Sequence, residues 1–404
     1  MTIRFPAVCL SILLAASAAR AAFTIPGFEL VCTLPVDTTL DPKDLRQAHE
    51  VWPEMFAGAR KSIDIEQFYI TPKDGEPLDA ALAELAKAGE RGVKIRFLLE
   101  KKFEKNSLEG IERLKKIPNL ELRMLEWGRM AGEGIIHAKF MVVDGKEAYV
   151  GSQNFDWRSL KHIHEMGLKV TEPQVAKDIA AVFDADWAAQ AKIAAGAKVP
   201  VLNKTRPAAP AGKRAYLVAS PYAFNPPGVG DSESELSRLL GTAQKEAAVQ
   251  VLDYAPLTYA GPGGKRRFYA PIDNAIRDAA VRGVKVKLLV SHWNTDKPAI
   301  EHLKGLSLVP NVEIRIATIP EAKEGFVPFA RVNHSKFMVI DGKTLWLGTS
   351  NWTGGYLDNS RNLEIVVNDE ALAARALAVH SQLWDSQYSA PIDVAKDYPK
   401  PRKG

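Results

Sequence analysis

The chain has 404 residues, of which 46% are hydrophobic and 25% are charged. These values exclude a disordered or fibrous protein, and the length allows two or three domains or two similar halves with full hydrophobic cores. The net charge of +5 is mildly basic and does not by itself identify nucleic acid as a partner.

Residues 1–21 have the features of an export signal. Arg4 gives a positive start, residues 7–19 form an apolar stretch, and Ala19-Arg20-Ala21 fits a small-x-small cleavage site. The apolar run is too short to cross a bilayer comfortably, so a retained anchor is the weaker interpretation, and no later segment predicts a stable membrane span. We therefore expect a secreted or periplasmic protein whose signal peptide is removed.

The cysteine content predicts a mature protein without disulfides. Cys9 would leave with the signal peptide, so Cys32 would stand alone. Cys32 lies in residues 28–33, a predicted strand, and is better explained as a small core residue than as a nucleophile.

Strands and helices alternate in the predicted elements that follow. Residues 61–69 alternate apolar and polar side chains like a half-buried strand, and residues 78–89 carry Leu and Ala at helical spacing. Residues 91–99 then lead through a glycine turn into another strand. This alternation predicts α/β structure, with a largely parallel or mixed sheet covered by helices.

The second part of the chain repeats this order, which indicates two similar α/β halves. Residues 248–254 predict a strand, residues 270–280 a helix, and residues 282–290 the returning strand. A stretch rich in Ala, Pro and Lys lies between the two parts and is typical of a linker. The predicted boundaries are 22–194 for the N-terminal half, 195–213 for the linker and 214–404 for the C-terminal half.

One polar motif occurs in both halves. Its copies are His137-Ala-Lys139-Phe-Met-Val-Val-Asp144 and His334-Ser-Lys336-Phe-Met-Val-Ile-Asp341. Each lies in an apolar β-type run, whose period of two places His and Lys on the same strand face. Asp-Gly then predicts a tight turn, and the returning strand brings a small-residue turn ending in Asn154 or Asn351 beside the His–Lys pair. We expect the two halves to share one active site at their interface.

These residue types fit phosphodiester chemistry. We expect His137 to attack phosphorus and form a covalent phosphohistidine, while His334 protonates the leaving alkoxide and then deprotonates water. One imidazole must be bare while the other carries a proton, so the two rings need different protonation states. Glu165 and Glu364 follow the two histidines at similar distances and are expected to accept the other ring N–H of each imidazole. The expected ligands of the phosphoryl oxygens are Lys139, Lys336, Asn154 and Asn351.

The motif aspartates are expected to be structural. Asp144 and Asp341 would lie outside the substrate contacts, where they fix the turn or pair with a basic residue. A plain Asp-Gly hairpin explains them as well as any catalytic role.

No metal or other cofactor is required by this scheme, because the lysines supply the positive charge that a metal would provide. His162-x-His164 lacks a matching cluster of ligands and is interpreted as an exposed loop pair. The chain also lacks a Walker-type phosphate loop and the Gly-x-Ser-x-Gly elbow of α/β-hydrolases.

The duplicated motif resembles the signature of the phospholipase D superfamily. The resemblance is closer to the branch of lysosomal phospholipase D-like proteins, and it implies two α/β halves around a shared site. It also implies 5′ exonuclease activity on single-stranded nucleic acid, while lipid transphosphatidylation has been ascribed to the same branch. This chain departs from the animal proteins in having almost no cysteines in its mature part, and Asp341 completes a motif that the branch often leaves incomplete. The segments that carry the likeness are residues 28–31, 134–144, 151–160, 331–339, 348–356 and 384–388.

Nucleic acid and phospholipid both contain the bond that such a site would cut. Aromatic rings near the second motif could stack on bases, and a basic run could meet phosphates. No exposed apolar rim or interfacial helix stands out for lipid, so an exonuclease is favoured and a phospholipase D or transphosphatidylase is the alternative. A binding module without activity is disfavoured because no motif His or Lys is lost. DNA versus RNA, the direction of attack and the oligomeric state stay open. The candidate substrate contacts are Tyr254, Lys265, Arg266, Arg267, Trp293 and Trp352.

Overall fold

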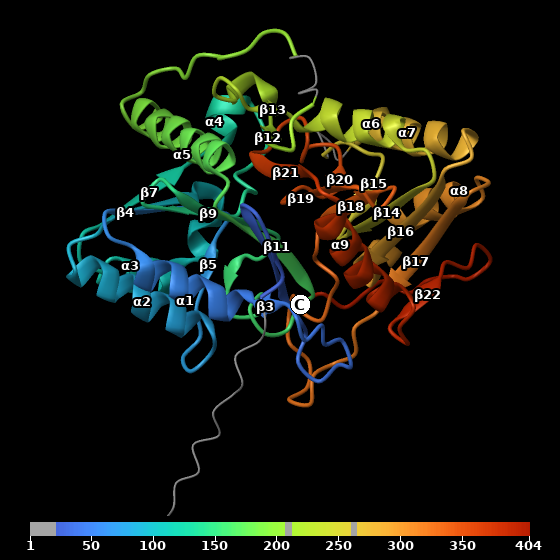
Figure 1. Ribbon diagram of the computed structural model, residues 1–404, viewed down its shortest axis with the longest axis horizontal. Coiled ribbons are helices and arrows are strands. Elements are labelled where there is room, and N and C mark those ends of the chain that lie inside the picture. The colour runs from blue at the N-terminus through green and yellow to red at the C-terminus, as the bar shows by residue number, and fades with distance from the viewer. Residues whose placement is uncertain (1–21, 207–211, 260–264) are drawn as a thin grey trace, which may run out of the picture.

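The computed structural model describes residues 22–206, 212–259 and 265–404. Two nine-stranded mixed sheets form its framework, one in each half of the chain, and Figure 1 shows the halves side by side. The predicted signal peptide lies outside the described residues.

The first sheet has the order β1-β2-β11-β9-β8-β4-β6-β7, with β3 paired to β2. Its strands are β1 (Thr24–Ile25), β2 (Phe28–Thr33), β3 (Arg46–Gln47), β4 (Ser62–Gln67), β6 (Lys94–Glu100), β7 (Leu120–Leu125), β8 (Phe140–Val143), β9 (Glu147–Gly151) and β11 (Glu165–Val170). A separate pair joins β5 (Ile70–Thr71) to β10 (Phe155–Asp156). The helices of this half are α1 (Ala48–Gly58), α2 (Leu78–Glu90), η1 (Lys101–Asn106), α3 (Leu108–Leu114), α4 (Gly128–Ala131) and α5 (Pro173–Ala194).

The second sheet has the order β13-β12-β21-β19-β18-β14-β16-β17-β22. Its strands are β12 (Ala215–Ser220), β13 (Gly230–Asp231), β14 (Glu246–Val251), β16 (Lys285–Ser291), β17 (Val312–Ala317), β18 (Phe337–Ile340), β19 (Thr344–Gly348), β21 (Asn362–Asn368) and β22 (Ser389–Pro391). A separate pair joins β15 (Tyr254–Ala255) to β20 (Trp352–Thr353). The helices are η2 (Tyr222–Phe224), α6 (Ser232–Thr242), α7 (Ala270–Val281), η4 (His292–Thr295), α8 (Ala299–Ser307) and α9 (Glu370–Trp384).

The two sheets repeat one topology. The order β2-β11-β9-β8-β4-β6-β7 in the first half corresponds to β12-β21-β19-β18-β14-β16-β17 in the second. In each half the strands equivalent to β4, β6 and β7 pair in parallel, and the hairpin equivalent to β8–β9 pairs antiparallel. The prediction of two similar α/β halves is therefore confirmed.

Helices cover the outer face of each sheet, and one core joins the halves. Helices α1 and α2 pack on the first sheet, and α6, α7 and α8 pack on the second. The largest cluster of buried side chains combines β8, β9 and β11 with β19 and β21, and it includes α5 and α9. Burial at this scale holds the halves together, because apolar area removed from water is the main favourable term in folding.

Most predicted elements exist with small shifts at their ends. The helix predicted over residues 78–89 is α2, which buries Leu78, Ala81, Leu82, Leu85 and Ala88 at helical spacing. Cys32 lies in β2 with no exposed surface, which confirms it as a core residue. The motif itself differs: β8 and β18 begin only after the motif lysines, so His and Lys lie in the approach to each strand and not within it. Among the described residues, no helix is long and apolar enough to span a bilayer.

Candidate active site

Each motif histidine is held in place by the opposite half of the chain. The His137 N–H donates to the Arg361 carbonyl at 2.9 Å, and the His334 N–H donates to the His164 carbonyl at 2.9 Å. The N–H groups of Arg361 and His164 donate back, each at 2.9 Å, to the carbonyl two residues before the histidine. These crossed backbone bonds bring the two motifs together at the interface, so the halves do share one polar centre.

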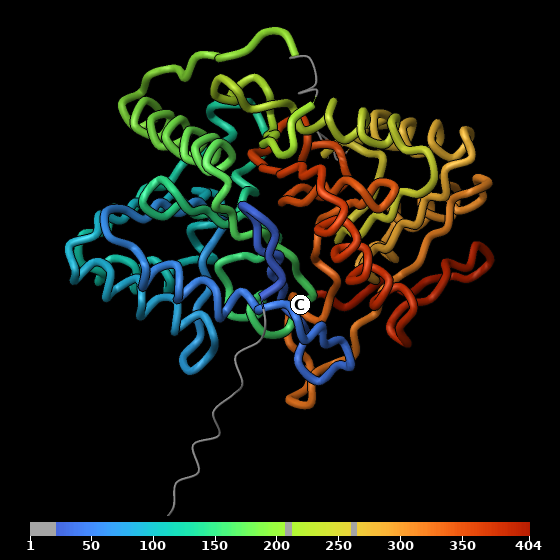
Figure 2. Tube along the Cα trace, in the orientation of Figure 1, coloured from blue at the N-terminus to red at the C-terminus, as the bar shows by residue number. Residues whose placement is uncertain are grey.

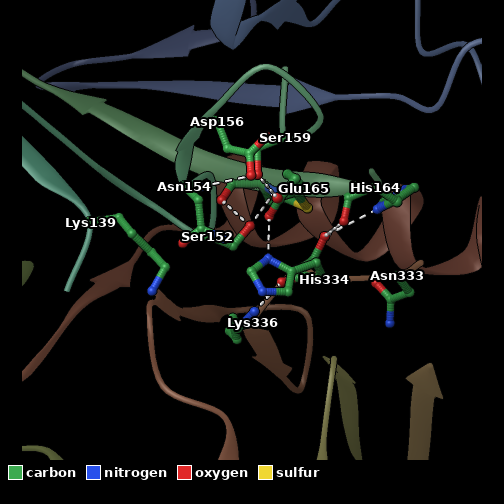
Figure 3. Close-up of polar contacts among 12 residues, drawn as sticks. Lys139, Ser152, Asn154, Asp156, Ser159, His164, Glu165, Asn333, His334 and Lys336 are labelled. Carbon is green, nitrogen blue, oxygen red and sulfur yellow. Dashed lines mark hydrogen bonds and ion pairs between the residues drawn. The ribbon is translucent and has the colours of Figure 1, made fainter. Parts of the chain in front are cut away.

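His334 is paired with a carboxylate from the first half. Its Nδ1 lies 2.8 Å from Glu165 Oε2, and Figure 3 shows the ring between Glu165 and Lys336. Ser159 Oγ donates to the other oxygen of Glu165 at 2.9 Å. Burial raises the pKa of Glu165, but the electrostatic influence of His334 and Lys336 and the hydrogen bonds outweigh it and hold the pKa below its usual value. Glu165 is therefore a buried carboxylate poised to support an imidazolium at His334.

His137 is paired with an amide. Its Nδ1 lies 2.9 Å from Asn362 Oδ1, which also accepts from Thr349 Oγ1 at 2.9 Å. The Asn362 amide is oriented by its Nδ2, which donates to the Tyr356 carbonyl at 2.8 Å. Because Asn362 Oδ1 can only accept a hydrogen bond, the proton of the neutral His137 ring must lie on Nδ1, and Nε2 keeps its lone pair. The two histidines therefore differ in their partners, as an attacking and a protonating imidazole should.

The expected role of Glu364 is wrong. Its carboxylate contacts the hydroxyl groups of Ser232 and Ser350, and burial raises its pKa to about 7. The offset between His137 and His334 equals the offset between Glu165 and Asn362, which makes Asn362 the counterpart of Glu165. Glu364 lies two residues further along β21, in a buried polar contact outside the histidine pair.

Both motif lysines are buried at the same centre. Lys336 Nζ donates to the His334 carbonyl at 2.5 Å, and Lys139 Nζ donates likewise to the His137 carbonyl. Burial lowers the pKa of Lys336 to about 7, against the opposing influence of Glu165 and Asp253. Burial and the charge of Lys336 also lower the pKa of Lys139 well below its usual value.

Burial and the surrounding positive charge lower the pKa values of the two histidines as well. Burial and the two lysines lower the pKa of His137 well below its usual value. Burial also lowers the pKa of His334 to about 4, although Glu165 opposes the shift. A phosphodiester between these four side chains would supply the counter-charge that they lack and raise their pKa values. The electrostatics therefore favour an anionic ligand.

The two asparagines lie at the same centre, each just after a hairpin strand. Asn154 Oδ1 and Asn351 Oδ1 are buried and have no hydrogen-bond partner within the described residues. Both amides thus retain hydrogen-bonding capacity toward a ligand.

The motif aspartates fasten the hairpin to a neighbouring turn. Asp144 accepts the backbone N–H groups of residues 60–62, and Asp341 accepts those of residues 244–246. Burial raises the pKa of each carboxyl, but the backbone N–H groups outweigh it and leave the pKa below its usual value. These contacts fit the expected structural role. Of the two expected arrangements, the aspartates fix a turn through backbone amides and do not pair with a basic side chain.

Two of the six expected substrate contacts are core residues. Trp352 has no exposed surface, and Tyr254 is 1% exposed with its hydroxyl bonded to Asp273, so the expectation that their rings stack on bases is wrong. Trp293 is partly exposed and lines a cavity of about 240 Å³ together with Arg266. Lys265 and Arg267 are exposed, as Arg266 is.

A group of aromatic rings lies around His137, and sequence reasoning missed two of them, Phe68 and Phe103. The Tyr356 ring centroid lies 4.7 Å from that of His137, and the Phe68 centroid lies 5.4 Å from it on another element. Phe103 packs on Phe68 with centroids 4.1 Å apart. Phe68 directly follows β4, and residues that follow a strand end often line a functional site. This position was the signal by which the sequence could have identified Phe68.

The pair His162 and His164 is buried, so its interpretation as an exposed loop pair is wrong. His162 Nε2 lies 3.0 Å from Glu324, and His164 Nδ1 lies 3.1 Å from Ser335 Oγ. Within residues 22–206, 212–259 and 265–404, no group of three or more His, Cys, Asp or Glu side chains is arranged to hold a metal ion.

Comparison with known proteins identifies the family. The family described as "Cardiolipin synthase, PLD-like domain" matches residues 53–187 and 268–384. The chain is 33% identical over 376 residues to phospholipase D Z of Dictyostelium discoideum, with 85% of this chain and 86% of that protein covered. It is 30% identical over 387 residues to the 5′-3′ exonuclease PLD3 of Bos taurus, with 86% of this chain and 76% of that protein covered.

Solved structures agree on the fold. Phosphatidylserine synthase of Haemophilus influenzae superposes with a TM-score of 0.61 at 13% identity, covering 85% of each chain. The duplicated motif, the crossed histidine centre and these relatives together place the chain in the phospholipase D superfamily, near the PLD3 5′-3′ exonucleases, and make it a phosphodiesterase.

Proposed function

We propose that the protein is an exported, metal-independent exonuclease that degrades single-stranded nucleic acid from the 5′ end through a phosphohistidine at His137. The observation that carries the mechanism is the difference between the two ring partners, an amide at His137 and a carboxylate at His334. Export rests on the signal-like composition of residues 1–21.

The first step forms the covalent intermediate. The lone pair on His137 Nε2 attacks phosphorus, and the P–O bond to the leaving nucleoside breaks. The leaving oxygen takes the proton of His334 Nε2–H, and Glu165 has supported that imidazolium. Lys139 and Lys336 neutralise the phosphoryl oxygens while the charge on them grows.

The second step releases the product. His334, now neutral, removes a proton from water, and the hydroxide attacks phosphorus as the P–N bond to His137 breaks. His137 Nε2 recovers its lone pair and His334 recovers its proton, so the site returns to its starting state. All proton transfers use side chains of this chain, which supports metal independence.

Single-stranded nucleic acid is favoured as the substrate by the rings beside the nucleophile. Phe68 and Tyr356 lie edge-on to His137 and are partly exposed, so a base next to the scissile phosphate would have aromatic surfaces to stack on. The similarity to proteins named 5′-3′ exonuclease supports the same choice. Relatives named phospholipase D keep a phospholipase or transphosphatidylase as the second candidate.

One set of assays separates the candidates. Purified mature protein is offered single-stranded oligonucleotides blocked at the 5′ or the 3′ end, and phosphatidylcholine vesicles in parallel. The proposal expects stepwise shortening of oligonucleotides with a free 5′ end and resistance when that end is blocked. Preferential release of choline from the vesicles would replace the exonuclease by the phospholipase.

A further inference from the structure

The last residues of the chain return to the junction of the two halves. Residues 392–404, here called the C-terminal strap, follow β22, and Figure 2 shows the C-terminus between the halves. Lys304 Nζ donates to the Lys396 carbonyl at 2.7 Å, and Thr295 Oγ1 donates to the Pro399 carbonyl at 3.1 Å. The Phe329 N–H donates to the Lys403 carbonyl at 2.6 Å. The strap is thus attached along its length to the second half.

The tip of the strap forms one wall of a cavity beside the active centre. Lys403 lines the cavity of about 240 Å³ that also contains Trp293 and Tyr259. Its Nζ lies 3.8 Å from Asp296 Oδ2 and 5.6 Å from the centroid of the Trp293 ring. The same cavity is lined by Tyr356, whose ring packs against His137. The cavity is therefore bordered by Tyr356, which contacts the proposed nucleophile, and by Lys403 of the strap.

The lining has the chemistry of a nucleoside site. Tyr259 and Trp293 offer aromatic faces to a base, and Asp253 offers a carboxylate to a sugar hydroxyl. Lys403 offers donors to base or phosphate oxygens. The volume is below the roughly 300–1,000 Å³ of pockets that enclose drug-sized ligands, so it suits one nucleoside at a time.

The two halves differ at this point. In the second half, the chain that follows α9 forms β22 and then the strap over η4. In the first half, the chain that follows the equivalent helix α5 runs to η2 instead, where the Leu202 N–H donates to the Ala223 carbonyl at 2.8 Å. The segment η1, the counterpart of η4, carries the exposed side chains of Lys101, Lys102 and Lys105. The strap therefore forms a wall on the side of the second half alone, although the rest of the site repeats between the two halves.

We propose that this cavity is the binding site for the terminal nucleoside of a single strand, and that the C-terminal strap is the stop that makes the enzyme act from an end. A strand that meets the strap cannot continue past it, so an internal phosphodiester cannot reach the histidines. This inference rests on the proposed nuclease function, which it extends to the structural origin of exonucleolytic action.

The experiment compares a linear and a circular single-stranded DNA of the same sequence. The variants are a chain that ends at Pro399, the point variant Lys403→Glu, and the control Lys400→Ala, which changes an exposed lysine of the same strap that does not line the cavity. Wild type and control should cut the linear strand alone. The truncated chain should also cut the circle, and Lys403→Glu should raise the KM for the linear strand by roughly fivefold or more. The rate on bis(4-nitrophenyl) phosphate should stay within about twofold in Lys400→Ala, because that substrate reaches only the histidine centre and Lys400 lies outside both the centre and the cavity.

The outcomes are distinguishable. Cleavage of the circle by the wild type overturns the inference. A truncated chain with the Tm of the wild type that cuts the linear strand and leaves the circle intact also overturns it. If truncation prevents folding, Lys403→Glu decides: a KM equal to that of Lys400→Ala overturns the site. A wild type that cuts bis(4-nitrophenyl) phosphate and neither DNA refutes the proposed nuclease itself.

Discussion

Exchanging the ring partners of the two histidines should move opposite limbs of the pH profile. Asn362→Asp gives His137 a carboxylate in place of the amide at 2.9 Å, and Glu165→Gln removes the carboxylate from His334. In the wild type, His334 keeps its proton to higher pH than His137 because the buried Glu165 supports its cation.

The size of each shift follows from the hydrogen bonds. A hydrogen bond to a charged group contributes roughly 1.5–3 kcal/mol and a neutral one roughly 0.5–1.5 kcal/mol, so the exchange changes the free energy of the imidazolium by about 1–1.5 kcal/mol. That corresponds to about one pKa unit. Asn362→Asp should therefore raise the pKa of His137, and Glu165→Gln should lower the pKa of His334 from its value of about 4.

The assay is kcat/KM against pH for a dinucleotide phosphodiester, whose alkoxide leaving group needs a proton from the acid, and it reports the ionisations of the free enzyme. The wild type should have an acidic optimum, because activity falls when the nucleophile is protonated at low pH and when the acid is deprotonated at higher pH. Asn362→Asp should shift the acid limb up by about one unit, and Glu165→Gln should shift the alkaline limb down. Asn368→Asp, the same change on the same strand at an exposed position, is the matched control. If Asn362→Asp moves the alkaline limb instead, the roles of the two histidines are reversed.

Three further outcomes are expected. Activity should persist after dialysis against excess EDTA, and a loss restored by one divalent ion would reveal a metal site. Orthovanadate should raise the Tm of the wild type. Lys139→Met and Lys336→Met should each reduce that increase, because each variant lacks one of the buried cations that bind the anion. A rise in Tm as large in both variants as in the wild type would contradict the role of the lysines in binding the phosphoryl group. Replacing Lys265, Arg266 and Arg267 together by Ala should raise the KM for oligonucleotides and flatten its salt dependence, and an unchanged salt slope would show that the three form only a solvated loop.

The sequence was sufficient for features that repeat within each half. The strand–helix–strand order and the hairpins after the motifs follow from periodicity and Asp-Gly turns, which depend on neighbours along the chain. The likeness to the phospholipase D superfamily supported the shared site that the repeated motif predicted, and the comparisons confirmed that family.

The errors arose in contacts between segments that are far apart in the sequence. Glu165 was expected to accept a ring N–H of a motif histidine and does so, but the crossed strands deliver it to His334 of the opposite half and not to the histidine that it follows in the sequence. Glu364 was matched to Glu165 by residue type, although the backbone register assigns that place to Asn362. Trp352 pairs with Tyr254 in a small two-stranded sheet, where both side chains are buried. The pattern of aromatic residues in the sequence alone did not distinguish this core from a binding surface.

The covalent intermediate on His137 is the central claim, and His334→Ala offers the direct way to trap it. A nucleotide ester with a nitrophenyl leaving group needs no proton from residue 334 to depart, but the second step needs a base there to activate water. Rapid acid-free quenching followed by mass spectrometry of peptides should locate one phosphoryl-nucleoside adduct on His137 in this variant. An adduct on another residue, or burst-free turnover of the same ester with no adduct on any histidine, would contradict the account.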